Sequence, residues 1–480
     1  MNGSIIRYII GWVLNIEAVF LTLPCIVAVI YQEKSGFAFL ITLAVSGLLG
    51  FILTRKKPDN ITLYTKEGFV TVALCWIVLS IVGAVPFYIS GEIPSIINAL
   101  FENVSGFTTT GATILNDVES LSYCMLFWRS FTLWIGGMGV LVFVLTVLPV
   151  TGGHNIHLLR AESPGHSVGK LVPRVRSTAM ILYKIYIVLT IIQIIFLLSG
   201  GVNLFDSLTI AFGTAGTGGF GIRADSLASY SAYIQNVVMV FMILFGINFN
   251  VYFFFLIKKP KQALKFEELR YYFGVILLAV IVIAINIRGM FDGWGTTVKH
   301  AVFQVASIIS TTGYTITDYN LWPQLSKTIL IILMLIGACS GSTGGGIKLS
   351  RAVILFKTAK KELNTLVHSR SVKKIQFCGR TIEHEVIRSI NVFIVTYLML
   401  FICSLLLISI DNFDFTTTFT AVISTLNNIG LGLEGVGPAH NFAAFSPLSK
   451  VVMMFNMLAG RLEIFPILLL FRVSTWKKIK

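Results

Sequence analysis

Four short segments of this sequence end in the same way, on a small polar run closed by a glycine. They align without gaps as NALFENVSGFTTTG (98–111), DSLTIAFGTAGTGG (206–219), HAVFQVASIISTTG (300–313) and TTFTAVISTLNNIG (417–430). The eighth position is small in every copy: Ser105, Gly213, Ser307 and Ser424. Such segments offer many uncharged oxygen atoms and little bulk, which suits the coordination of a small cation.

The residue types in these loops favour a monovalent cation. Four sets of carbonyl groups around one axis replace the hydration shell of such an ion. Glycine lets the chain turn a carbonyl inward, because it reaches dihedrals that a β-carbon disfavours. The hydroxyls of Thr110 and Thr312 are expected to add oxygen atoms without a full charge. No carboxylate lies inside the loops, which argues against an acidic divalent-cation filter, and no Arg or Lys lines them as in an anion pore.

A single glycine-bearing loop, taken alone, is more often a site of close helix packing than a filter. Four ungapped copies at intervals of roughly a hundred residues reverse that balance, because a repeat of this kind predicts equivalent places around a shared axis. Polar loops at membrane depth are tolerated only where protein covers them or water meets them. The sequence therefore predicts an aqueous pathway.

The rest of the chain has the composition of a membrane protein. Of 480 residues, 55% are hydrophobic and 12% charged, against about 25% charged in soluble domains, and the mean hydropathy is +0.83. Roughly ten segments have the length of about 17–25 apolar residues that crosses a bilayer. Each polar window lies between two of them, so the unit is expected to be helix, re-entrant helix with its loop, helix.

The predicted fold is an all-α polytopic membrane protein, with four pseudo-symmetric helix–pore-loop–helix repeats around a central pore. Two extra apolar segments, near 5–30 and 37–53, precede the repeats. The expected divisions are 1–57 for the two extra N-terminal membrane helices, 58–152 for repeat 1, 153–258 for repeat 2, 259–357 for repeat 3 with a broken second helix, and 358–480 for a cytoplasmic loop and repeat 4.

The net charge of +15 is distributed unevenly. Basic clusters occur at 55–57, 160–176, 258–265, 348–388 and 477–480. The complementary loops carry Asp117, Glu119, Asp225, Asp318 and Glu434. This alternation follows the positive-inside rule, so the basic loops and both termini are expected in the cytoplasm, and nucleic-acid binding is not needed to explain the charge. The six cysteines form no close pair, so no metal motif, redox motif or disulfide framework is predicted.

The loop sequences SGFTTTGAT (105–113), GTGGFG (216–221), STTGYT (310–315) and NNIGLG (427–432) resemble the filter segments of the bacterial Trk/Ktr potassium transporter superfamily. The resemblance covers nearly the whole chain, and the two extra N-terminal helices suit the membrane subunit of Trk systems. It implies ion binding at backbone carbonyls near four filter glycines. The implied ion-binding residues are Thr110, Gly111, Gly218, Gly219, Thr312, Gly313, Ile429 and Gly430, supported by Thr109, Thr217, Thr311 and Asn428.

The same resemblance favours potassium, because glycine at position 111 is the potassium-type choice and serine there goes with sodium in plant relatives. Ile429 departs most from the family's threonine-containing pattern. The resemblance further implies a homodimer, a cytosolic ring of nucleotide-binding (TrkA-type) regulatory subunits, a bacterial inner-membrane location and no cofactor beyond the transported potassium ion.

A glycine-rich stretch, GACSGSTGGGIK (337–348), interrupts the hydrophobic segment after the third loop. Each glycine costs a helix interior about 0.5–1 kcal/mol relative to alanine, so a break is expected. Its spacing does not fit a phosphate-binding loop, and no strand precedes it. By the resemblance it is the intramembrane loop that blocks the path below the filter. The gate candidates are Gly337, Gly341, Gly344, Gly345, Gly346, Lys348 and Arg461, although outward snorkelling of Lys348 is an equal alternative.

Other charged residues touch the predicted spans. Arg129 is interpreted as an interface anchor and Glu17 as a group with a partner in the bundle, while the role of Glu463 stays open. Asp206 and Asp414 precede their short helices and are expected to cap them.

Three functions are compatible with these features. The favoured function is potassium uptake through a gated four-loop filter, by a channel or a symport mechanism. The alternatives are a sodium-selective or weakly selective cation transporter, and a secondary symporter with broken helices. Four parallel repeats disfavour an inverted-repeat symporter. No HExxH, GxSxG or cysteine–histidine set is present, so an enzyme is not expected.

Overall fold

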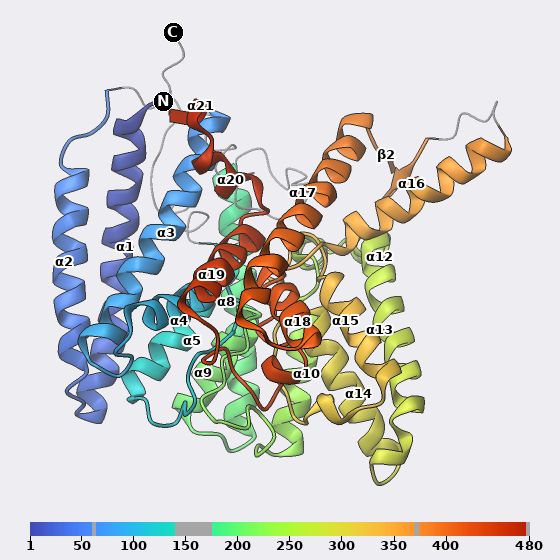
Figure 1. The fold of residues 1–480 in the computed structure, drawn as a ribbon, viewed down its shortest axis with the longest axis horizontal. Coiled ribbons are helices and arrows are strands. Elements are labelled where there is room, and N and C mark those ends of the chain that lie inside the picture. Colours follow the sequence, from blue (N-terminus) through green and yellow to red (C-terminus); the bar gives the residue numbers. More distant parts are fainter. Residues whose placement is uncertain (60–63, 140–174, 369–373, 477–480) are drawn as a thin grey trace.

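The computed structural model describes residues 1–59, 64–139, 175–368 and 374–476. These residues form a helical protein whose only sheet in the described part is a two-stranded hairpin of β1 (Gln376–Phe377) and β2 (Arg380–Thr381). The prediction of an all-α polytopic fold is confirmed. The start of α1 and the end of α21 lie at the same end of the molecule, which is the upper end in Figure 1.

The two extra N-terminal helices form an antiparallel pair at one edge of the molecule (Figure 1). They are α1 (Gly3–Tyr31) and α2 (Gly36–Thr54), within a residue or two of the predicted segments. Close packing between them depends on small residues: a β-carbon on Gly11 would lie 2.7 Å from Leu53 Cβ. The outer face of α2 is apolar and open, with Leu48 61% and Phe51 62% exposed, which fits contact with lipid.

Four copies of one unit follow. Its first helices are α3 (Thr65–Ile89), α8 (Val175–Ser199), α13 (Glu267–Asn286) and α17 (His384–Ile408). Its short re-entrant helices are α4 (Ile96–Phe107), α9 (Leu204–Ala215), α14 (Trp294–Ile309) and α18 (Phe415–Leu426). Its second helices are α5 (Tyr123–Met138), α10 (Ala232–Phe245), α15 (Gln324–Leu335) and α19 (Pro447–Arg461). The re-entrant helices are too short to span a bilayer, as the sequence predicted.

The second helices are interrupted far more often than the sequence indicated. A break was predicted only after α15, yet α10 and α11 (Phe249–Leu256) meet at 91°, although residues 234–257 read as one apolar run. The hydroxyl of Tyr272 lies where a β-carbon of Gly246 would stand, and Asn248 caps the new helix by accepting from Asn250 N–H at 2.9 Å. The fourth repeat breaks between Arg461 and α20 (Phe465–Phe471), at Glu463 (φ 54°) and Ile464 (φ 70°).

The described residues contain six helices that are long and apolar enough to cross a membrane, or seven if the bent pair counts as one span. Of the other three predicted segments, those of α15 and α19 are interrupted before they reach spanning length. The segment that begins with α5 continues outside the described residues.

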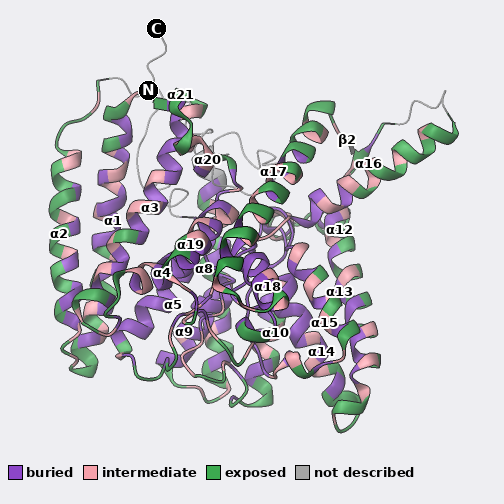
Figure 2. Cartoon of the chain, in the orientation of Figure 1, coloured by how far each residue is buried: buried purple, intermediate pink, exposed green. Residues whose placement is uncertain are grey.

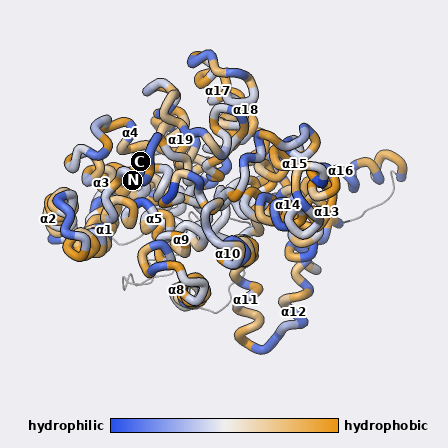
Figure 3. Tube along the Cα trace, turned by 90° about the horizontal axis from the view of Figure 1, so that it is seen from below, coloured by the Kyte–Doolittle hydropathy of each residue, from blue (hydrophilic) through white to orange (hydrophobic). Residues whose placement is uncertain are grey.

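Burial concentrates around the re-entrant helices in the middle of the molecule, whereas the peripheral helices expose one face (Figure 2). That outer face is hydrophobic: on α13, Leu277 and Leu278 are 62% and 66% exposed. Seen from below, hydrophobic stretches run along α1, α2 and α13 at the periphery (Figure 3). A membrane protein with an apolar perimeter around a polar centre gives this pattern.

The upper end carries α16 (Leu349–Val367) and the hairpin. Helix α16 projects away from the bundle, and the β1–β2 hairpin lies beside it (Figure 1). The shorter elements are α12 (Pro260–Leu264), α21 (Val473–Trp476), η1 (Arg288–Met290), η2 (Tyr319–Leu321), η3 (Ser409–Asp411) and η4 (Glu434–Val436). The basic cluster predicted at 160–176 lies almost wholly outside the described residues.

Candidate ion pathway

Each re-entrant helix is partly exposed in its first turn and buried in its last turns, so its C-terminus lies inside the molecule. Asp414 caps α18 as predicted, accepting from Thr417 N–H at 2.9 Å. The predicted cap at Asp206 is wrong, because Asn203 caps α9 and accepts from Asp206 N–H at 2.7 Å. The carboxylate of Asp206 instead accepts from the hydroxyl of Tyr230 at 2.8 Å.

The segments after these helices share an unusual backbone. A left-handed residue stands two positions before each closing glycine: Thr109 (φ 56°), Thr217 (55°), Thr311 (60°) and Asn428 (55°). The closing glycines are left-handed as well: Gly111 (78°), Gly219 (61°), Gly313 (83°) and Gly430 (85°). The residue between each pair has no positive φ. Alternation of this kind gathers successive N–H groups on one side of the chain and leaves the carbonyl groups to the other.

The N–H groups of these segments are satisfied by the re-entrant helices themselves. Donors are the residues just before the closing glycines, and each acceptor is the carbonyl of the small eighth residue of the window. The pairs are Thr110 to Ser105 (2.9 Å), Gly218 to Gly213 (3.0 Å), Thr312 to Ser307 (2.9 Å) and Ile429 to Ser424 (2.9 Å). The four-fold repetition seen in the sequence is therefore repeated in the hydrogen bonds.

The four closing glycines form a ring with the carbonyl oxygens of the neighbouring strands. A β-carbon on Gly111 would lie 1.7 Å from Gly218 O, and one on Gly219 would lie 2.0 Å from Thr312 O. A β-carbon on Gly313 would lie 2.3 Å from Ile429 O, and one on Gly430 2.4 Å from Thr110 O, which closes the circle. Only glycine fits these places, because both the positive φ and the close carbonyl exclude a side chain.

The hydroxyls of Thr110 and Thr312 have a different role from the one predicted. Thr108 donates to Val104 O, so the hydroxyl of Thr110, 2.8 Å from that of Thr108, serves as its donor. Thr110 also accepts from Asn428 Nδ2 at 2.9 Å. Thr312 is held in the same way, 2.7 Å from the hydroxyl of Ser310. These hydroxyls brace the strands, so the backbone carbonyls are the oxygen atoms left for an ion.

Ile429 departs from the loop pattern only in its side chain. That side chain is fully buried and belongs to a hydrophobic cluster behind the strand. Its carbonyl takes the same place in the ring as those of Thr110, Gly218 and Thr312. The fourth strand is braced by Asn428, which donates to Met457 O at 2.9 Å as well as to Thr110.

Arg129 is not an interface anchor. It is 2% exposed and forms an ion pair of 2.8 Å with Glu102, whose side chain is fully buried. Its guanidinium lies 4.1 Å from the ring centre of Phe220 and donates to Gly221 O at 3.2 Å. Glu102 also accepts from Ile114 N–H at 3.0 Å. The pair therefore links the residues that follow the first filter strand to those that follow the second.

The glycine-rich stretch between α15 and α16 lies against the residues that come just before the third and fourth closing glycines. Its two ends are tied together, since Gly337 N–H donates to Ile347 O at 2.8 Å and Leu349 N–H to Ala338 O at 3.2 Å. A β-carbon on Gly344 would lie 2.9 Å from Ser310 O, and one on Gly345 would lie 2.3 Å from Asn427 O. The loop thus packs directly on the backbone of the third and fourth strands.

The two basic gate candidates both contact this loop. Lys348 is 2% exposed and donates to Gly344 O and, at 3.4 Å, to Gly345 O, so it does not snorkel outward. Arg461 donates to Thr343 O at 2.9 Å and to Gly137 O at 2.8 Å. The arginine therefore bridges the loop and the end of α5 in the first repeat.

Sequence reasoning missed several groups that hold the loop. Glu463 pairs with Arg351 at 2.5 Å, and Glu268, 3% exposed, accepts from Ser340 N–H at 2.7 Å. Phe249 N–H donates to Gly341 O at 3.0 Å, which fastens the loop to the break after α10. For Glu268, Arg351 and Glu463 the only signal in the sequence was a charged residue at the end of an apolar run. Membrane proteins also use such charges to set their topology. Glu17 is 1% exposed, and its carboxylate oxygens have no hydrogen-bond partner within the described chain, contrary to expectation.

A ring of carbonyl groups at the ends of four re-entrant helices, surrounded by an apolar perimeter, defines a membrane protein that moves cations. The chain belongs to the TrkH family, described as cation transport protein, which it matches over residues 35–290 and 293–478. The family is one of transport proteins rather than enzymes, as the sequence predicted.

Individual relatives extend this likeness over the full length. The Trk system potassium uptake protein TrkH of Salmonella typhimurium is 36% identical over 100% of both chains. TrkG of the same system in Escherichia coli K12 is 33% identical over 99% of this chain and 100% of that protein. A crystal structure of the potassium transporter TrkH from Vibrio parahaemolyticus matches with a TM-score of 0.89 and 31% identity, over 99% of this chain and 100% of that one.

Proposed function

We propose that this protein takes up potassium across the bacterial inner membrane through the ring of carbonyl oxygens. The observation that carries the proposal is the closed circle in which each filter glycine abuts the carbonyl of the next strand, from Gly111 through Gly219 and Gly313 to Gly430. The full-length relatives named as potassium uptake proteins support the choice of ion.

Neutral oxygen atoms favour a monovalent cation in this ring. The buried carboxylate of Glu102 is already paired with Arg129, and Asp206 with Tyr230 and Arg223. The C-terminal ends of four helices point at the centre, where their dipoles favour positive charge. A ring without acidic side chains does not offer the charge that a divalent ion needs to shed its water.

The glycine-rich loop at 337–348 is proposed as the gate. It packs directly on the backbone of the third and fourth filter strands, and two cationic side chains, Lys348 and Arg461, donate hydrogen bonds to its carbonyls. Positive charge close to the path raises the energy of an approaching potassium ion. Hydrogen bonds with Phe249 of α11, Glu268 of α13 and Arg461 of α19 keep the loop in place, so opening requires an input from outside the pore.

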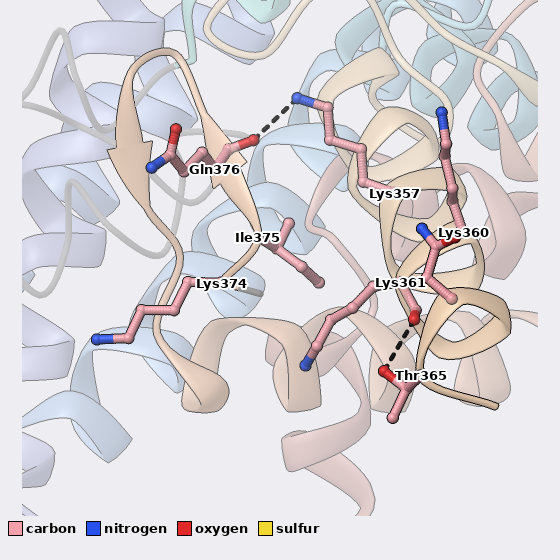
Figure 4. A pocket seen from close by; sticks show the side chains of 8 residues that line it. Lys357, Lys360, Lys361, Thr365, Lys374, Ile375 and Gln376 are labelled. Atoms are coloured by element: carbon pink, nitrogen blue, oxygen red, sulfur yellow. Dashed lines mark hydrogen bonds between the residues drawn. The ribbon is translucent and has the colours of Figure 1, made fainter. Parts of the chain in front are cut away.

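That input is proposed to come from a cytosolic nucleotide-binding partner. The loop continues into α16, where Lys357, Lys360, Lys361 and Lys374 surround a cavity of about 200 Å³ at the upper end (Figure 4). Lys357 is paired with Glu267 and donates to Gln376 O at 2.8 Å, while Lys360, Lys361 and Lys374 point in different directions around the cavity. A basic surface fits an acidic docking partner. The upper end is then cytoplasmic, with both termini, and the family resemblance supports a homodimer.

The test is rubidium uptake into proteoliposomes, with potassium or sodium as competitor. Competition by potassium but not sodium, weakened by Gly111→Ser, supports the proposal. Equal competition by sodium favours the weakly selective alternative. Uptake that depends on a proton or sodium gradient identifies a symporter, a mechanism to which the interrupted helices are also suited.

A further inference from the structure

The loop and the filter are joined by one hydrogen bond that has no counterpart in the other repeats. Gly345 N–H donates to the hydroxyl oxygen of Thr311 at 2.7 Å. Thr311 is fully buried and Gly345 is buried as well, so water does not replace this bond while the loop is in place. Thr311 is the left-handed residue of the third filter strand, two positions before Gly313.

The equivalent residues of the other strands have other partners. The hydroxyl of Thr109 has no hydrogen-bond partner in the described part of the chain. That of Thr217 bonds within its own strand, to Gly216 O at 2.6 Å. Asn428 reaches Thr110 and Met457. Of these four equivalent residues, Thr311 is the one whose side chain accepts a hydrogen bond from the loop.

We propose that Thr311 is a positioning residue that couples the filter to the gate, an inference that rests on the gate role proposed above. The bond exists only while Gly345 lies under the ring, so withdrawing the loop releases the third strand at the residue that sets its carbonyl direction. Coupling between two sites is reciprocal. A filter held in its conducting shape by potassium therefore stabilises the loop, and a filter with the wrong ion loosens it.

The magnitude follows from the buried N–H. Replacing Thr311 with valine keeps the shape and leaves the Gly345 N–H without an acceptor in the closed state, whereas water satisfies it once the loop withdraws. A lost partner of this kind shifts the equilibrium by roughly five- to 150-fold toward the withdrawn loop. Rubidium flux without the cytosolic partner rises by the same factor, provided that the loop is mostly closed in the parent protein.

The experiment compares Thr311→Val with Thr71→Val, a fully buried threonine of α3 whose hydroxyl donates to Glu67 O within its own helix, and with Thr311→Ser, which keeps the acceptor. We expect raised partner-free flux in Thr311→Val alone. Equal flux in all three variants and the parent overturns the coupling. In a protein from which residues 341–345 are deleted, Thr311→Val is expected to cause no further rise in partner-free rubidium flux. An undiminished rise there places the role of Thr311 in the filter only and also overturns the coupling.

Two further outcomes distinguish failure of the gate proposal from failure of the coupling. If the shortened loop leaves partner-free flux at the parent level, the gate proposal fails and the coupling fails with it. If shortening raises flux but Thr311→Val does not, only the coupling fails. Hydrogen exchange of the 337–348 segment in the parent protein gives a test that needs no variant: slower exchange in potassium than in sodium is expected, and equal exchange contradicts the coupling.

Discussion

Replacing Gly111 with alanine tests the filter through a single added methyl group. The new Cβ would stand 1.7 Å from Gly218 O, so the first and second strands must separate by about 1.7 Å to restore an ordinary contact of about 3.4 Å. The left-handed backbone adds about 1–2 kcal/mol for a residue with a side chain. Overpacking typically adds about 1–3 kcal/mol. The filter's conducting shape is therefore destabilised by about 2–5 kcal/mol, while the outer helices are untouched.

Gly293→Ala is the matched control, because Gly293 has the same left-handed backbone (φ 83°) with nothing within 4 Å of the added carbon. It carries the backbone strain without the clash. We expect Gly111→Ala to lower the preference for potassium over sodium by at least about tenfold, since about 1.4 kcal/mol corresponds to that factor. The assay is rubidium uptake with each ion as competitor, normalised to protein in the membrane. Parental selectivity in Gly111→Ala, or an equal loss in Gly293→Ala, would refute the reasoning.

Three further predictions concern a buried ion pair, the gate loop and the basic cavity. Arg129→Met leaves the buried carboxylate of Glu102 unpaired, so the free energy of unfolding should fall by about 3–5 kcal/mol and the unfolding temperature should drop. A second change, Glu102→Gln, should recover part of this loss. An unchanged unfolding temperature in Arg129→Met contradicts the role of the pair. Arg461→Met removes donors to Thr343 O and Gly137 O and should raise partner-free rubidium flux about tenfold, with Arg472→Met, outside the loop's contacts, as the control. Lys361→Glu, in the basic cavity, should weaken stimulation by the cytosolic partner about tenfold while partner-free flux stays unchanged; equal stimulation argues for another docking face.

The filter was predictable because its determinants lie close together in the sequence. Each window carries its own helix, its own left-handed residue and its own glycine, and the repeat itself implies a ring. Ile429 departs from the pattern only in its side chain, which packs in the core, whereas the proposed ion ligand is its backbone carbonyl. The sequence could not show that the hydroxyls of Thr110 and Thr312 turn away to brace the strands, because the choice depends on Thr108 and Ser310 and on neighbouring strands.

The contacts that hold the loop were not predictable, because their partners are far apart in the chain. Arg351 and Glu463 are separated by 112 residues, and Ser340 and Glu268 by 72. A charged residue near the end of an apolar run looks the same whether it anchors a helix at the surface or pairs inside the bundle. The bend after α10 was missed for a related reason: its causes are Tyr272, from the next repeat, and the loop carbonyl of Gly341.

The most direct test of the account is to locate the ion. Crystals grown in rubidium, measured at its absorption edge, should show anomalous density on the axis between the carbonyl oxygens of Thr110, Gly218, Thr312 and Ile429. With rubidium still present, this density should fade when potassium is added in excess and persist when sodium is added at the same concentration. Density away from this ring, or displacement of rubidium by sodium as readily as by potassium, would contradict the claim that potassium is selected by these four carbonyls.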